Sequence, residues 1–119
     1  MMPLIEEPSR LDARLSGALD ASTRLDSVDA NRVGAIGFCF GGLCAIKMAR
    51  LGLPLRGVVS LHGLLKIGTP LDHEVRARIL VLHGQDDPMV PPEDIGTFAA
   101  EMKRVDADWA LHALSLIHI

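Results

Sequence analysis

The sequence has few aromatic residues and few cysteines. Its 119 residues include no tyrosine, one tryptophan and three phenylalanines, so aliphatic side chains must fill most of the core. The two cysteines, Cys39 and Cys44, are separated by four residues, a spacing that fits neither a disulfide framework nor a zinc site. We therefore expect a reducing compartment, with the cytoplasm as the default.

An excess of positive charge and long hydrophobic runs are also missing. The 12 basic and 15 acidic residues give a formal net charge of −3, and the basic residues are scattered singly. This distribution excludes the basic stripe that nucleic-acid binding requires. No stretch reaches 18 apolar residues, and the first ten residues, MMPLIEEPSR, lack the basic start of a signal peptide. We expect neither a nucleic-acid partner nor a membrane partner.

What is present is an alternation of apolar runs with helical patterns. Short, partly β-branched runs predict strands, and periodic apolar positions predict helices between them. This alternation is typical of an α/β protein with a parallel sheet, and we expect its strands in sequential order with helices on both faces. The predicted strands are 32–38, 56–62, 78–83 and 108–114, and the predicted helices are 42–51, 92–105 and an amphipathic helix within residues 1–26 that Ser9 can cap.

Residues 34–42, GAIGFCFGG, join the first predicted strand to a helix. Gly37 to Gly41 fit the pattern glycine-x-nucleophile-x-glycine, in which a sharp strand-to-helix turn exposes a nucleophile, here Cys39. The plain alternative for Cys39 is a buried structural thiol. A phosphate-binding loop is excluded because Leu43 and Cys44 stand where that loop needs lysine and serine or threonine.

The stretches VGAIGFCFGGLCA, GVVSLHG and ILVLHGQDDPMVPPED together resemble the dienelactone hydrolase family of the α/β-hydrolase superfamily. The resemblance covers about residues 25 to 112 and joins a cysteine turn to a downstream His-Gly-x-x-Asp loop. It implies a partial α/β-hydrolase fold, a small ester or lactone as substrate, and no metal or organic cofactor.

The resemblance also implies roles for individual residues. Cys39 would be the nucleophile, the amide of Phe40 an oxyanion donor, and Asp87 the acid that orients a catalytic histidine. That histidine should follow the last strand, where His118 is the available residue, although its flanking residues differ from the family pattern. His62 and His83 each precede a glycine at a strand end and are interpreted as hydrogen-bonded structural histidines, and Cys44 as a core residue.

The resemblance matches only part of the family fold. We expect residues 27–114 to form the C-terminal half of the family domain, and residues 115–119 to be an atypical tail. The first four strands and the second oxyanion amide are then missing, so we expect this chain to be nearly inactive and the full-length protein to be a monomer or small oligomer. The alternative to an enzyme is a non-catalytic fragment or a redox-sensitive thiol protein.

Overall fold

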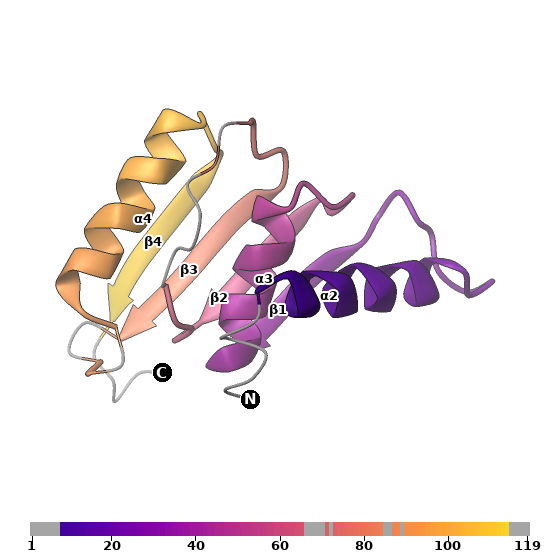
Figure 1. The fold of residues 1–119 in the computed structure, drawn as a ribbon, viewed down its shortest axis with the longest axis horizontal. Coiled ribbons are helices and arrows are strands. Elements are labelled where there is room, and N and C mark those ends of the chain that lie inside the picture. Colours follow the sequence, from indigo (N-terminus) through magenta and orange to yellow (C-terminus); the bar gives the residue numbers. More distant parts are fainter. Residues whose placement is uncertain (1–7, 66–70, 72, 85–86, 89, 115–119) are drawn as a thin grey trace.

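The computed structural model describes residues 1–119 except 1–7, 66–70, 72, 85–86, 89 and 115–119. The elements follow the chain as α2 (Pro8–Thr23), β1 (Gly34–Phe38), α3 (Phe40–Arg50), β2 (Gly57–Leu61), β3 (Arg78–Gly84), α4 (Pro92–Arg104) and β4 (Trp109–Leu114). All four strands lie within one or two residues of their predicted ranges at each end. Figure 1 shows the strands side by side with the helices in front of them.

The strands form one parallel sheet in the order β1-β2-β3-β4. Each strand pairs with the next one in the chain, for example Ala35 with Val58 and Val58 with Ile79. A parallel pair needs a crossover connection, which α3 supplies between β1 and β2 and α4 between β3 and β4. The predicted α/β class and sequential strand order are confirmed.

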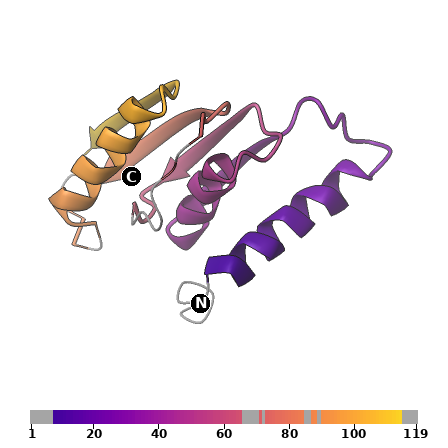
Figure 2. The same cartoon turned by 45° about the horizontal axis from the view of Figure 1, so that its top comes forward.

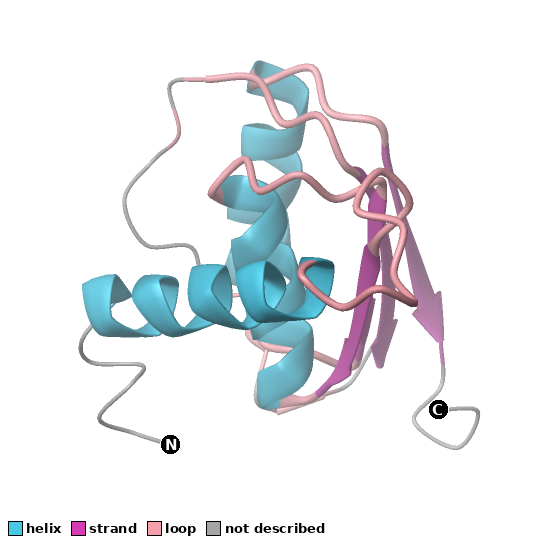
Figure 3. Cartoon of the chain, turned by 90° about the vertical axis from the view of Figure 1, so that its right-hand side faces the viewer, coloured by secondary structure: helices cyan, strands magenta, loops and turns pink. Residues whose placement is uncertain are grey.

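The position of the helices differs from the expectation in one respect. We expected helices on both faces, but α2, α3 and α4 all lie on one face of the sheet (Figure 3). The reason is geometric, because successive right-handed crossovers between neighbouring strands in sequential order return to the same side. On the other face the side chains of Ile36 and Phe38 are 67% and 61% exposed.

The core therefore lies between the sheet and the helices. Alternate residues of β2 and β3 point into it and are buried, as period-two alternation requires. Phe98 of α4 is fully buried and meets Trp109 of β4 edge to face, with ring centroids 5.8 Å apart. The other buried apolar residues of this core include Ala45, Ile46, Ala49, Val58, Ile79, Val81, Val90 and Met102.

Helix α2 lies apart from the sheet and packs against α3 (Figure 2). Leu19 of α2 belongs to the buried core, and Lys47 of α3 forms an ion pair with Asp12 of α2 at 3.0 Å. Among the described residues, no helix combines the length and the apolar character needed to cross a membrane. The division of the chain at residues 26 and 114 stays a prediction.

Candidate active site

Cys39 occupies a strained turn between β1 and α3. Its backbone has φ 53° and ψ −119°, a conformation that residues with a side chain rarely adopt. A Cβ on Gly37 would lie 2.1 Å from the carbonyl oxygen of Gly41, so only glycine fits at position 37. The Cys39 N–H donates to the Leu61 carbonyl of β2 at 3.1 Å, which fixes the turn to the sheet.

The turn presents the Cys39 thiol at the start of a helix. Cys39 is exposed, and it is the residue that precedes α3, whose first residue is Phe40. The first N–H groups of a helix have no partner within it and carry its positive end, which favours a thiolate or an oxyanion beside them. Cys39 thus lies at the start of a helix, as predicted, and α3 begins at Phe40, two residues before the predicted start at residue 42. The catalytic roles of Cys39 and Phe40 stay predictions.

His62 lies against Cys39. It follows β2, and its Nδ1 is 3.3 Å from the Cys39 Sγ while its Nε2 is 3.8 Å away. The His62 N–H donates to the Leu82 carbonyl at 2.8 Å, and its ring meets the ring of Phe38 edge to face at a centroid distance of 6.2 Å. The sequence favoured a structural role for His62, whereas the structure brings its ring to the candidate nucleophile.

Two glycines allow the Cys39 and His62 segments to approach each other. A Cβ on Gly42 would come within 2.8 Å of the Gly63 Cα, and a Cβ on Gly63 would come within 2.8 Å of the Gly42 Cα. Either Cβ would also lie about 2.5 Å from the buried Ser60 Oγ beneath them. The start of α3 and the segment after β2 are therefore in backbone contact, and no larger residue fits at either position.

Asp87 follows β3 at the same edge of the sheet. Its N–H donates to the Gly84 carbonyl at 3.0 Å, and its carbonyl accepts from the Val90 N–H at 3.1 Å, so its backbone is held in a turn. Cys39, His62 and Asp87 thus follow three neighbouring parallel strands, whose carboxyl ends meet at one edge. The role of Asp87 stays a prediction, and His118 lies outside the described residues.

His83 and Cys44 also lie near this edge. His83 is 1% exposed, and neither of its ring nitrogens has a hydrogen-bond partner among the described residues, unlike the hydrogen-bonded histidine that we expected. Cys44, one turn into α3, is half-buried. Burial raises the pKa of its thiol, and the Lys47 ammonium acts in the opposite direction. The raised pKa keeps the Cys44 thiol protonated at neutral pH.

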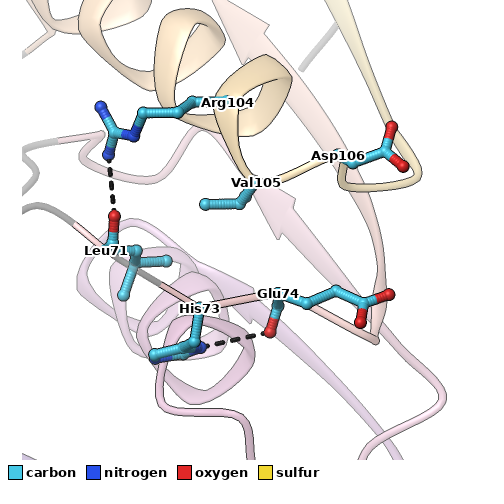
Figure 4. A pocket seen from close by; sticks show the side chains of 6 residues that line it. All are labelled: Leu71, His73, Glu74, Arg104, Val105 and Asp106. Carbon is cyan, nitrogen blue, oxygen red and sulfur yellow. Dashed lines mark hydrogen bonds between the residues drawn. The ribbon is translucent and has the colours of Figure 1, made fainter.

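A groove at the opposite edge of the sheet is distinct from this site. It has a volume of about 490 Å³ and lies where α4 ends and β4 is about to begin (Figure 4). The Arg104 side chain crosses it and donates a hydrogen bond to the Leu71 carbonyl at 3.2 Å, and the His73 ring forms a hydrogen bond with the Glu74 carbonyl.

No group of three or more potential metal ligands occurs among the described residues.

Comparison with known proteins gives consistent matches. A family model described as the dienelactone hydrolase family matches residues 1–116. An uncharacterized protein of Caenorhabditis elegans is 37% identical over 103 residues, which are 84% of this chain and 65% of that protein. The chain thus spans about two thirds of the length of this curated relative.

Two solved structures have the same arrangement. A dienelactone hydrolase-like promiscuous phosphotriesterase from metagenomic libraries is 33% identical with a TM-score of 0.87, over 98% of this chain and 49% of that one. The structure m3DLH is 37% identical with a TM-score of 0.91, over 97% of this chain and 48% of that one. The chain therefore corresponds to about half of each of these proteins.

Proposed function

Because this chain belongs to the dienelactone hydrolase family, we propose that its protein hydrolyses a lactone or a small carboxylic ester with Cys39 as the nucleophile. The observation that carries the proposal is the backbone of Cys39, with φ 53° between a strand and a helix. Such strain persists only where the surrounding structure enforces it, and it is typical of nucleophile turns.

The proposed reaction has two halves. In the first, the Cys39 thiolate attacks the carbonyl carbon, the Phe40 N–H donates to the oxygen that becomes negative, and the alcohol leaves with a proton, which forms a thioester. In the second, water attacks the thioester and releases the acid, and the thiol is restored. Asp87 would orient the histidine that moves these protons, with His118 proposed as that histidine, and these steps require no metal or organic cofactor.

The alternative is a thiol that is reversibly oxidised rather than acylated. An exposed cysteine beside an imidazole and a helix start favours oxidation chemistry as well as attack on esters. The two functions differ in turnover: a hydrolase releases acid repeatedly, whereas a redox thiol reacts once with an oxidant and requires a reductant for recovery.

A cytoplasmic location and a monomeric or small oligomeric state stay predictions. Cell fractionation can test the location, and size-exclusion chromatography can test the oligomeric state.

The experiment compares the 119-residue chain with the longest reading frame that contains it. Hydrolysis of p-nitrophenyl acetate, a small lactone and a phosphotriester is measured, the last because one relative is described as a phosphotriesterase. Each protein is also prepared as Cys39→Ala and, as the matched control, Cys44→Ala. We expect ester or lactone turnover by the longer protein that Cys39→Ala removes and Cys44→Ala leaves. Ester turnover that persists in Cys39→Ala would contradict the proposal.

A further inference from the structure

His62 has no role in the proposed triad, yet its ring contacts the candidate nucleophile. The Cys39 Sγ lies 3.3 Å from the His62 Nδ1 and 3.8 Å from its Nε2. A sulfur on the in-plane lone pair of Nδ1 would lie much farther from Nε2 than from Nδ1, because the two nitrogens are on opposite sides of the ring. The two similar distances therefore place the sulfur over the face of the imidazole, in a sulfur–aromatic contact.

The imidazole that makes this contact is held from several sides. The His62 N–H donates to the Leu82 carbonyl at 2.8 Å, and the Phe38 ring meets the imidazole edge to face at a centroid distance of 6.2 Å. The next residue, Gly63, is in backbone contact with Gly42 of α3, which fixes the segment that carries the ring. The ring is therefore a fixed surface beside the nucleophile.

Backbone strain indicates that the side chain at position 62 is used. His62 has φ 36°, a left-handed conformation that is unfavourable for a residue with a Cβ and that glycine adopts freely. Such strain persists only where the surrounding structure enforces it, and it is concentrated at functional sites. Among the described residues at the carboxyl edge, the non-glycine residues with a positive φ are His62 and Cys39, and these are the two whose side chains meet.

Cys39 needs such a surface because its turn fixes the backbone and leaves the sulfur free to rotate. A cysteine side chain has three staggered χ1 positions, and each places Sγ at a different point. Acylation requires the sulfur to reach the carbonyl carbon while the carbonyl oxygen lies at the Phe40 N–H, and small errors in placement lower the rate. The His62 ring covers one side of the sulfur, and Cys39 is nevertheless exposed, so a substrate can approach from the other side.

We propose that His62 is a positioning residue, whose ring face holds the Cys39 sulfur in the rotamer from which it attacks the carbonyl carbon. The contact moves no proton, and the proton transfers are left to the triad histidine. Because the ring face makes the contact, an aromatic ring without nitrogen atoms should replace the imidazole. The inference rests on the proposed function of Cys39.

The test compares two rates at Cys39 in the 119-residue chain, acetylation by p-nitrophenyl acetate and alkylation by iodoacetamide, each followed by peptide mass spectrometry. Both reactions use the thiolate, but only acetylation requires alignment with the Phe40 N–H, so the ratio of the rates reports the placement of the sulfur rather than its ionisation. We expect His62→Ala to lower this ratio about three- to tenfold, the range that a lost sulfur–aromatic contact accounts for. His62→Phe should retain the ratio, as should the control His112→Ala, which replaces an exposed histidine of β4.

His62→Gly guards against a loss of the fold, because glycine removes the ring and also relieves the φ of 36°. We expect this variant to be at least as stable as His62→Ala in thermal denaturation and to show the same lowered ratio. An unchanged ratio in folded His62→Gly, or a ratio in His62→Phe as low as that of His62→Ala, would overturn the positioning role.

A measurement without an ester separates this inference from the proposed function. The Hα–Hβ couplings of Cys39 in NMR spectra report its χ1 rotamer, and we expect a single rotamer in the unchanged chain and in His62→Phe but averaged couplings in His62→Gly. Averaged couplings in the unchanged chain would contradict the inference. If the couplings depend on His62 but Cys39 is acetylated in none of the chains, ester hydrolysis is contradicted and the hold on the sulfur stands. If Cys39 is acetylated with a ratio that does not depend on His62, the positioning role is contradicted and Cys39 remains the proposed nucleophile.

Discussion

The two edges of the sheet differ in how their polar groups are used. At the carboxyl edge, Cys39 and His62 have strained backbones, and Ser60 and His83 have buried polar atoms without hydrogen-bond partners among the described residues. At the amino edge the charges are paired, as in the contact of Arg50 with Glu101. The carboxyl edge therefore carries features that cost stability, and the amino edge carries contacts that hold the helices in place.

The ion pair of Arg50 with Glu101 is buried. The Arg50 Nε lies 2.7 Å from one Glu101 oxygen and its second guanidinium nitrogen lies 3.1 Å from the other. The Leu71 N–H and the Arg104 guanidinium also face Glu101, at 3.4 and 3.7 Å. This network links the C-terminal end of α3, the helix that follows Cys39, to α4, so the two edges are connected through α3.

The largest expected effect is at the nucleophile. Cys39→Ala should lower ester turnover of the longer protein by about a thousandfold or more, because no other group forms the thioester.

Cys39→Gly should be equally inactive yet more stable than Cys39→Ala by about 1 kcal/mol, since glycine adopts φ 53° without strain. Thermal denaturation of the two variants measures this difference, and equal stabilities would show that the turn is unstrained.

The next effect is at the amino edge. Glu101→Ala should lower the free energy of unfolding by about 3–5 kcal/mol, because it leaves the Arg50 guanidinium buried without its carboxylate. Asp108→Ala is the control: it removes an Arg78 ion pair whose side chains are 82% and 71% exposed, and it should change stability by less than about 0.5 kcal/mol. Urea denaturation distinguishes the two, and similar losses would mean that burial does not set the strength of these pairs.

Gly41 and Gly42, which are neighbours at the start of α3, should differ in how substitution by alanine changes stability. Gly42→Ala should destabilise the chain by about 1–3 kcal/mol, because its Cβ meets Ser60 Oγ and the Gly63 backbone. Gly41→Ala should not, since a Cβ there has no described atom within 4 Å outside its own helix backbone and alanine favours a helix. Denaturation curves of the two variants provide the measurement, and the prediction fails if Gly41→Ala is the more disruptive.

The smallest expected effect concerns pH. Burial raises the pKa of Cys44, so the unfolded chain loses this proton at a lower pH than the folded chain does. Stability should therefore be unaffected by Cys44 near neutral pH and should fall as pH rises above about 9. Cys44→Ala should flatten the decline in the alkaline range. An unchanged alkaline slope in Cys44→Ala would assign the decline to other groups.

The sequence predicted the elements and the nucleophile turn because their signals are local. Apolar runs and glycines define the four strands, and the five residues from Gly37 to Gly41 define the turn. The contact between His62 and Cys39 was missed because it joins two segments through the sheet. A histidine before a glycine at a strand end has no sequence feature that tells which way its ring points.

The sequence also did not predict the placement of the helices on one face or the buried network around Glu101. The expectation of helices on both faces neglected that sequential strand order and right-handed crossovers together place every connecting helix on one side. The network around Glu101 had no signal either, because a glutamate on an amphipathic helix normally points to solvent. Its burial depends on Arg50, which is 51 residues away in the sequence.

The sequential strand order has a consequence for how the chain folds. The register pairs Gly34 with Gly57, Val58 with Ile79 and Ile79 with Trp109, so each pairing closes a loop of roughly 20 to 30 residues. The loop between β2 and β3 is the shortest, and its strands bring the buried residues Val58, Ile79 and Val81 together. We expect β2 and β3 to pair first and the outer strands β1 and β4 to add afterwards. The strand that leads into Cys39, β1, would then join the sheet late and leave it early.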